Sequence, residues 1–356
     1  MSQPTVQQQA QPPADLEALL LVQAATLLAL EAGSAYASTS ALRAALAAFA
    51  RSANGRWLLA GAHPTTSAPL PAAVRDQVAA RLRAELRQAS AATQRIGPLL
   101  QREAEHALEV GVQHAGQQIG LMVDPASLVL DDIARALIDA TPRAAAAHIA
   151  RAGAMLAQAG NGTDLQTAIT EARRAVTAAD TGARYLTNHV ANDAVRQVAV
   201  RRGEQLLWIA ERDACVVCLA LAGHLADPNE GVGFDETATY GPYHAPEIWP
   251  PGMPLMRPPR HPHCRCQVCI WLGSAPGRPS FPERLRHEAA RSILKGWSRP
   301  SESNRVRLKA AQKLLAAGGR GLPKSVREEA AHAVARGSFR SRSIPHYQPT
   351  REHHHV

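Results

Sequence analysis

Apolar residues recur every three or four positions through most of the stretch from residue 72 to residue 203, and Arg and Glu occupy many of the positions between them. This is the period of an α-helix with one buried face. We expect helix boundaries at four breaks in the pattern, which are Gly97-Pro98, Asp124-Pro125, Thr141-Pro142 and Gly160-Asn161-Gly162. The third break combines a capping residue with a proline suited to the first helical position, and Thr163 follows the fourth as another capping residue. The stretch predicts long helices packed as a bundle or an extended arm.

The chain before this stretch is less regular. Residues 1–14 are rich in Gln and Pro and carry no charge, which predicts a disordered tail. Asp15 is a suitable N-cap for a helix that runs to about Glu31, and a second, short helix is expected over residues 43–51. Residues 61–71 contain Gly, Pro and Ser and predict a linker. Residues 15–203 together predict an α-helical body. A coiled coil is the alternative, but no strict heptad continues across the breaks.

The pattern changes at residue 204. Residues 204–272 hold all five cysteines and many prolines, with few helical repeats, and predict a compact, irregular unit that we name the Cys/His module. Residues 273–356, the C-terminal region, are helical again. Within them, residues 286–296 and 327–337 resemble each other, and each predicts a short helix that ends at a glycine. The expected fold class is mainly α: a helical bundle or extended helical arm, then the small irregular module, then a basic helical tail.

Composition and charge narrow this picture. Aromatic residues are only 4% of the 356 residues, and alanine supplies much of the apolar share, which suits closely packed helices and argues against a β-sandwich or barrel. The net charge of +9 is unevenly placed: residues 273–356 carry 17 Lys and Arg against 6 Asp and Glu, whereas residues 1–272 carry 22 against 24. A basic segment of this kind suits binding to DNA or to an acidic protein.

Two signals bear on location. The apolar run over residues 18–30 is too short to span a bilayer and is interrupted by Gln23 and Thr26, so we expect no transmembrane helix and no membrane partner. The first basic residue is Arg43, whereas a secretory signal begins with a positive region. We therefore expect a protein made and kept in the cytoplasm of the producing cell. In that reducing compartment, clustered cysteines favour metal binding over disulfides.

The strongest chemical signal is the pairing of a C-x2-C motif with a second Cys/His cluster 42 residues later. Cys215 and Cys218 form a knuckle whose two thiolates can converge on one tetrahedral ion. The preferred zinc ligands are these two with two of His261, Cys264 and Cys266, while His263 and Cys269 are the extra donors. A disulfide or redox pair and inert burial are the alternatives. A site closed by four protein ligands would be structural, replacing the hydrophobic core that a proline-rich segment cannot form.

Large side chains in and beside the Cys/His module have two interpretations. Trp208 and Trp271 bracket the module, and core packing is the expected role of both. The loop aromatics could form a partner-contact surface, but we favour packing over the metal knuckle as a lid. These loop residues are Phe234, Tyr240, Tyr243, His244 and Trp249.

The order of these residues resembles a known family. Trp208 and Asp213 precede the C-x2-C motif, Leu221 and Gly223 follow it, and a long loop leads to a Pro-Pro-x-His-Pro-x-Cys-Arg-Cys closure at residues 258–266. This arrangement is similar to the phage Mu F-like head morphogenesis proteins over residues 140–272. The resemblance implies a minor capsid protein of a tailed bacteriophage, made in the host cytoplasm and built into the procapsid near the portal. Its implied partners are the portal protein and other capsid or scaffold proteins, and its implied location is the virion.

Other function classes lack their motifs. Residues 318–325 do not form a phosphate-binding loop, because Pro323 stands before Lys324-Ser325 where a glycine is required. His287-Glu288 is not continued to H-E-x-x-H, since Arg291 occupies the last position. The sequence shows no motif that pairs a nucleophile with a general base, so we expect that the protein is not an enzyme. The alternatives kept are a phage enzyme, either a capsid maturation protease or a zinc-supported nuclease, and a zinc-ribbon DNA-binding regulator.

Overall fold

The computed structural model of the chain describes residues 15–234, 254–273, 280–299, 302–318 and 322–340. Within these ranges it contains nine α-helices, one 3₁₀ turn and one three-stranded sheet. The expected class, mainly α with a small module that carries the cysteines, is confirmed. The predicted tail over residues 1–14 lies outside the described residues.

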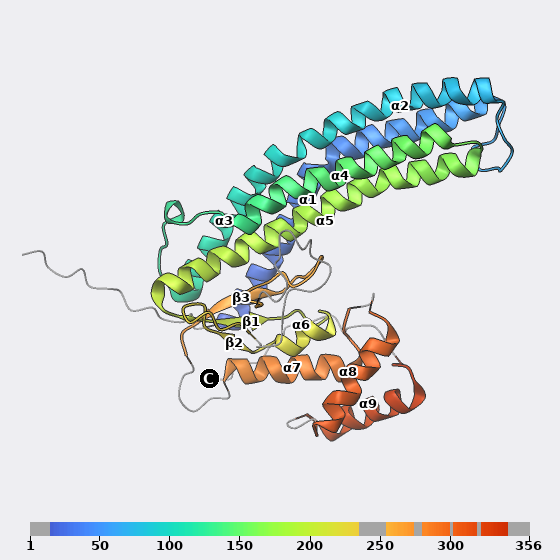
Figure 1. Cartoon of the computed structure of the whole chain (residues 1–356). Helices are drawn as coiled ribbons and strands as arrows, with labels where there is room; N and C mark the ends of the chain where they lie inside the picture. The colour runs from blue at the N-terminus through green and yellow to red at the C-terminus, as the bar shows by residue number, and fades with distance from the viewer. Residues whose placement is uncertain (1–14, 235–253, 274–279, 300–301, 319–321, 341–356) are drawn as a thin grey trace, which may run out of the picture.

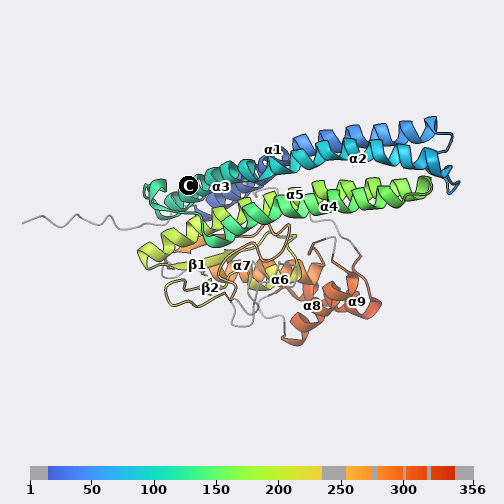
Figure 2. The same ribbon diagram turned by 45° about the horizontal axis from the view of Figure 1, so that its top comes forward.

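Five helices form an elongated up-and-down bundle (Figures 1 and 2). Their bounds are α1 (Leu16–Leu59), α2 (Ala72–Gln94), α3 (Ile96–Ile119), α4 (Asp132–Gln158) and α5 (Gly162–Arg202). Helices α2 and α3 follow one another as a single leg with a break at Arg95, directly before the expected Gly97-Pro98. Helix α5 contacts α1, α3 and α4 along its 41 residues, which is about 60 Å of helix. One end of the bundle projects beyond the rest of the molecule.

The bundle joins the two helices expected near the N-terminus into one. Asp15 caps α1 as predicted, with its side chain accepting a hydrogen bond from the Ala18 amide. The helix then continues through the Gly- and Ser-containing residues 32–42 to Leu59 instead of ending near Glu31. Tertiary contact decides this, because α1 packs on α5 and α2 and buries Ser34, Ser38 and Thr39. Packing of this kind contributes more to helical stability than local propensity does.

Two other expected boundaries move. Pro142 lies inside α4 and not at a helix start, so the Thr141 cap is wrong. Thr141 instead packs tightly against Gly182 of α5, and the α4–α5 contact keeps the helix continuous despite the missing proline N–H. Asp124-Pro125 begins only a 3₁₀ turn, Pro125–Ser127, before α4 starts.

Close backbone contacts at the projecting end explain the last break. Asn161, and not Thr163, caps α5, and its side chain accepts a hydrogen bond from the Asp164 amide. Gly162 donates its N–H to the Thr66 carbonyl, and a Cβ there would stand 2.5 Å from the His63 carbonyl oxygen. The predicted linker over residues 61–71 is therefore packed against the α4–α5 turn.

Helix α1 also meets a membrane criterion. Among the described residues it is the one helix long and apolar enough, by length and composition, to cross a membrane, over a window of mean hydropathy 1.6. A third of that window is buried in the fold, and core helices of soluble proteins meet the same criterion. The absence of a membrane partner stays a prediction.

The Cys/His module begins with a strand that the sequence did not indicate. The sheet has the order β2-β1-β3 and consists of β1 (Gln205–Ile209), β2 (Leu225–Ala226) and β3 (Gln267–Trp271), all antiparallel neighbours. Leu206 and Trp208 alternate into the core shared with the bundle, while Leu207 faces a second cluster formed with α1 and helix α7 (Phe281–Lys295). This two-residue period matches a strand buried on both faces.

The C-terminal region folds as α7 (Phe281–Lys295), α8 (Asn304–Ala316) and α9 (Lys324–Arg336). The two similar segments fall on α7 and α9, and both helices end at a left-handed glycine, Gly296 and Gly337, as predicted. Leu219 of α6 (Val216–Leu221) and Ala222, the C-cap of that helix, share a hydrophobic cluster with Ile293 and Leu294 of α7. The C-terminal helices are therefore packed on the Cys/His module (Figure 1).

Candidate metal centre

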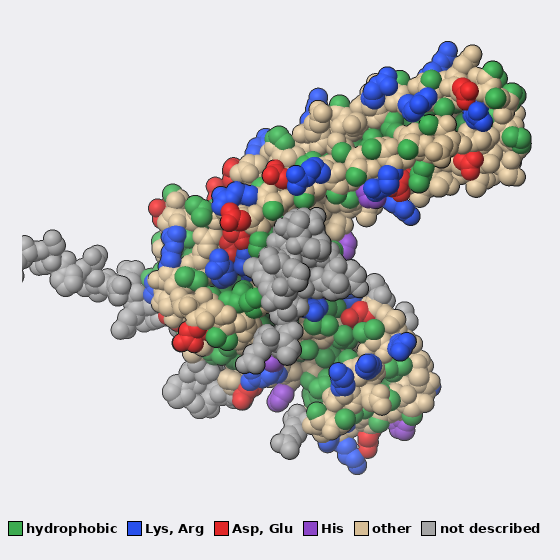
Figure 3. All heavy atoms as spheres, viewed as in Figure 1, with side chains coloured by type: hydrophobic (Ala, Val, Ile, Leu, Met, Phe, Trp, Pro, Cys, Tyr) green, Lys and Arg blue, Asp and Glu red, His purple; other side chains and the backbone are tan. Residues whose placement is uncertain are grey.

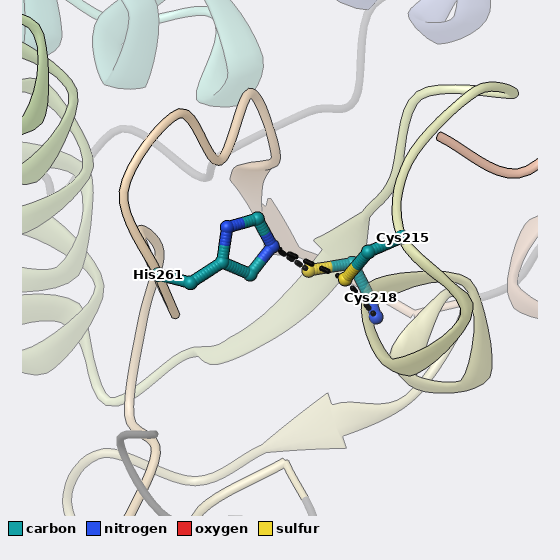
Figure 4. Close-up of side chains that lie close together, drawn as sticks. All are labelled: Cys215, Cys218 and His261. Carbon is teal, nitrogen blue, oxygen red and sulfur yellow. Dashed lines mark hydrogen bonds between the residues drawn. The ribbon is translucent and has the colours of Figure 1, made fainter. Parts of the chain in front are cut away.

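Helix α6 and the loop before β3 bring the five sequence-predicted donors together. Cys215 is the N-cap of α6, and Cys218 lies one turn later on the same side. His261 comes from the opposite loop, and its ring points at both cysteines (Figure 4). Cys264 and Cys266 follow in that loop, and both are buried.

The distances that join Cys218 and His261 to their neighbours suit a tetrahedral metal ion. The Cys215 and Cys218 sulfurs lie 3.1 and 3.5 Å from His261 Nε2, and the Cys218 and Cys264 sulfurs lie 3.8 Å apart. Two thiolates that bind a tetrahedral zinc at about 2.3 Å stand about 3.8 Å from each other. Cys218 belongs to two groups of donors within 4.8 Å, one with Cys215 and His261 and one with Cys264 and Cys266. The cluster can hold a metal such as zinc.

The imidazole of His261 is oriented for this role. Its Nδ1 lies 2.8 Å from the Pro262 carbonyl oxygen, which can only accept, so Nδ1 carries the proton. In the neutral ring, the form that binds a metal, the lone pair of Nε2 is then directed at the thiols. Fixing the tautomer of a ligating histidine through its other nitrogen is the usual support in metal sites.

Charge balance in the cluster also favours a cation. The hydrogen bond from Cys218, with help from His261, lowers the pKa of Cys215 to about 4 against the effect of burial. Cys218 has its pKa raised by its contacts with Cys215 and Cys264. Burial alone would lower the pKa of His261, but the contact with the Cys215 thiolate raises it to about 9. Crowded thiols cannot all ionise beside a single imidazolium, whereas a divalent cation would allow it.

The two extra donors of the sequence belong to neither group of donors. Cys269 lies on β3 in the cluster formed with Leu20 and Leu207, where burial raises the pKa of its thiol to about 12. His263 is exposed, has a φ of 61° and lines the small cavity among the ligands. The structure therefore brings together the five residues expected as ligands and places Cys269 apart from them.

The C-terminal region supports the knuckle directly. Glu302 accepts a hydrogen bond from the Val216 amide at the start of α6, and the Arg299 amide donates to the Ala214 carbonyl. An ion pair between Arg265 and Asp213 ties the two ligand-bearing loops together. These contacts satisfy the first α6 amide and tie the two loops to each other and to the C-terminal region.

The bundle holds the other side of the module through side-chain amides. Asn192 of α5 accepts a hydrogen bond from the Val268 amide at 2.8 Å, and Gln118 of α3 accepts one from the Ile270 amide at 3.0 Å. These are the β3 amides that face away from β1, so the two side chains occupy the place of a further strand. Asn188 of α5 donates to Glu31 of α1 at 2.9 Å, within the bundle, and to the Cys266 carbonyl of the module at 3.5 Å.

A buried charged group anchors the loop that leads to His261. Arg257, 4% exposed, forms ion pairs with Asp131 at the start of α4 and with Asp193 of α5. Asp131 also pairs with His189, which is fully buried, and its pKa is held below its usual range because these contacts outweigh burial. Burial lowers the pKa of His189, with the nearby Arg257 adding to the effect. Sequence reasoning missed this group, since the partners lie 58 to 126 residues apart.

The tryptophan predictions hold as packing. Trp208 is fully buried and meets the ring of Phe234 edge-on at 5.1 Å. Trp271 is half-buried and packs beside Phe281. The lid expected from Tyr240, Tyr243, His244 and Trp249 lies outside the described residues.

A comparison of the chain with protein families, with curated proteins and with solved structures gave no match.

Proposed function

We propose that the chain is a structural minor head protein of a tailed bacteriophage that acts in procapsid assembly near the portal. The observation that carries the proposal is the convergence of the C-x2-C knuckle with the His-Pro-x-Cys-Arg-Cys loop. That pair of motifs is the specific part of the resemblance to Mu F-like head proteins. The partners proposed are the portal protein and other capsid or scaffold proteins, and the location proposed is the virion.

The proposed ion is one structural zinc per chain, held by Cys215 and Cys218 with two of His261, Cys264 and Cys266. The donor set supports this, because thiolates with imidazole select zinc over magnesium or calcium. When bound, the ion would supply cross-linking of the two loops and no reaction step. The cavity among the ligands is about 30 Å³, room for about one water, which suits a closed site better than one that admits a substrate.

Particle composition tests the head function. Mass spectrometry of procapsids and mature particles made by the producing phage should find the chain at a few copies per particle. A deletion of its gene should leave portal and capsid protein made but particles incomplete. The proposal would be overturned, and the zinc-ribbon regulator favoured, by two results together: the deletion gives normal infectious particles, and wild-type particles do not contain the chain.

We also propose that the C-terminal region contacts packaged DNA. Its excess of basic residues supports this, and Lys and Arg side chains are visible over α8 and α9 as well as along the bundle (Figure 3). Not every arginine counted from the sequence is free to do so. Arg307 is 1% exposed, packed near Phe339, and Arg286 donates to the Gly223 carbonyl.

Salt dependence separates DNA contact from protein contact. The full chain, assayed by filter binding on random duplex DNA, should lose affinity with a log–log slope of about −0.9 for each phosphate neutralised. Arg305→Gln with Lys309→Gln on α8 should reduce the slope. Absence of binding at low salt would reassign the basic residues to an acidic protein partner.

A further inference from the structure

A long apolar groove lies along the N-terminal half of α1. Its larger part is a pocket of about 450 Å³ between α1, the end of β1 and α7. A second pocket of about 220 Å³ continues it along α1 and shares Leu21, Ala24 and Glu211 with the first. Together they extend from Glu17 to Glu31, which is about 21 Å or four helical turns.

The floor and walls of the groove are hydrophobic. Aliphatic and aromatic side chains from four elements line the larger pocket, among them Leu20, Leu21, Ile209, Leu219, Phe281 and Leu285. On α1, Leu21 is 48% exposed and Leu28 is 46% exposed. Large apolar side chains left open side by side in a concave surface mark a binding site more often than isolated ones do.

The rim of the groove is acidic. Five carboxylates line the two pockets, and they are Glu17, Glu31, Glu211, Asp213 and Glu288. Only two basic side chains line them, Arg212 and Arg265, and these pair with Glu288 and Asp213. Glu17 pairs with Arg284, which does not line the pockets. Two lining carboxylates, Glu31 and Glu211, are left without an arginine partner among the described residues.

Glu211 is the centre of this charge. It lines both pockets, and among the described residues its carboxylate forms no hydrogen bond or ion pair. Burial raises its pKa, with Asp213 adding to the effect against Arg265 and Arg212. Burial likewise raises the pKa of Glu31 to about 7. A cation placed in the groove would favour the ionised form of both carboxylates.

The edge of the sheet beside the groove excludes an extended occupant. Gln267 at the start of β3 lines the larger pocket, but the outward amides of Val268 and Ile270 are already bonded to Asn192 and Gln118. A strand could not add its main chain there. A helix satisfies its own backbone and needs only apolar anchors with flanking charges, which is what the groove complements.

We propose that this groove is the docking site for a basic amphipathic helix of a partner protein, about four turns long, whose apolar side chains fill the two pockets and whose Lys or Arg meets Glu211. The inference does not depend on the proposed head function, and none of the five metal donors lines the groove. Residues 1–14 carry no basic charge, and residues 341–356 carry two prolines that would interrupt four turns of helix. The chain's own termini are poorer matches than a separate helix.

A designed peptide pair tests the proposal on the full chain. The probe has leucines at positions i, i+4, i+7 and i+11 with flanking lysines, and its partner replaces every lysine by glutamate. Fluorescence anisotropy should show micromolar binding of the lysine peptide and binding at least tenfold weaker of the glutamate peptide. Equal binding of both peptides, or of neither, would overturn the proposal.

Two matched pairs of variants locate the binding. Leu21→Ser and Glu211→Gln should each weaken the lysine peptide about tenfold. The controls Val22→Ser, on the same helix and 64% exposed, and Glu230→Gln, exposed and remote, should leave it unchanged. Circular dichroism checks that each variant is folded. If Leu21→Ser and Glu211→Gln bind as the wild type does, the groove is not the site.

Three other occupants of the groove would each give a different experimental result. A chain that sediments as a dimer, and becomes a monomer with Leu21→Ser, would assign the groove to a second copy. Competition by a synthetic copy of residues 341–356 would assign it to the chain's own end. Binding of the chain to anionic vesicles, lost with Leu21→Ser, would assign it to a lipid surface. Each of these results would overturn the partner-helix proposal.

Discussion

The bundle of α1 to α5 and the Cys/His module share one hydrophobic core, but different interactions hold them in place. The bundle buries rows of alanine and leucine along helices of 23 to 44 residues, so its stability is spread over many small contacts. The module has short strands and one six-residue helix, and a few polar groups determine its shape. We therefore expect single substitutions to lower the free energy of unfolding by small amounts in the bundle and by large amounts in the module.

The largest effect is expected from the metal cluster. Cys218→Ser removes the donor common to both groups and should reduce bound zinc from about one ion per chain to near zero. The module should then unfold while much of the bundle helicity remains, because structural zinc contributes on the order of 10 kcal/mol to small metal-dependent folds. Metal analysis by mass spectrometry and hydrogen exchange across residues 204–272 measure the two effects. Cys269→Ala is the matched control and should keep the metal. Wild-type protein purified under reducing conditions without any metal would contradict the prediction.

The charged anchor between the two regions should come next. Arg257→Met leaves Asp131 and Asp193 without their buried partner, and the loss of one member of a buried ion pair costs about 3–5 kcal/mol. Urea unfolding followed by circular dichroism measures this free energy. Arg196→Ala removes the more exposed partner of Asp193 and should cost below about 1 kcal/mol. Equal losses for the two variants would show that the module is not anchored through Arg257.

Glu31, buried where α1 contacts α5, should make the stability of the protein depend on pH. Burial raises its pKa to about 7 from an ordinary value near 4.5, so the folded state holds a proton that the unfolded state releases. The associated stability is present below about pH 4.5 and is lost as the pH rises through 7, by about 3 kcal/mol in all. Glu31→Gln keeps an acceptor for Asn188 and should be more stable than the wild type at pH 8, with a smaller difference at pH 5. Urea unfolding that gives the same free-energy difference between Glu31→Gln and the wild type at both pH values would contradict this.

The smallest effects should come from glycines within the bundle. A Cβ at Gly111 of α3 would stand 2.4 Å from the Ala191 carbonyl oxygen of α5, so Gly111→Ala should destabilise the protein by about 1–3 kcal/mol. Gly33 of α1 has nothing within 4 Å of its Cβ position, so Gly33→Ala should stabilise by about 0.5–1 kcal/mol. Thermal unfolding measures both. A stabilising Gly111→Ala would show that α3 and α5 are not in close contact.

Local chemistry explains which features could be predicted from the chain alone. Helical periodicity, the Asp15 cap and the glycine ends of α7 and α9 depend on residues within one or two turns, so they were readable. The knuckle was also readable, because Cys215 and Cys218 lie one helical turn apart on the same side of a short helix. The same spacing between Cys266 and Cys269 does not bring those thiols together, because Cys269 lies on a strand. The set of five donors and the separation of Cys269 agree with the structure.

Only the tertiary structure decided the features that depend on distant partners. Helix α1 continues past Glu31, and Pro142 stays inside α4, because contacts with α5 outweigh local stop signals. Strand β1 forms because Asn192 and Gln118 cap its partner β3 from helices over 70 residues away. The apolar groove is likewise built from distant segments, because β1 begins about 190 residues after the start of α1 and α7 about 260 residues after it. No local sequence pattern therefore marks the groove. The sequence determines which side chains each segment carries. Packing determines which of these side chains come into contact, because the free energy of burial depends on neighbours that the chain brings together only when it folds.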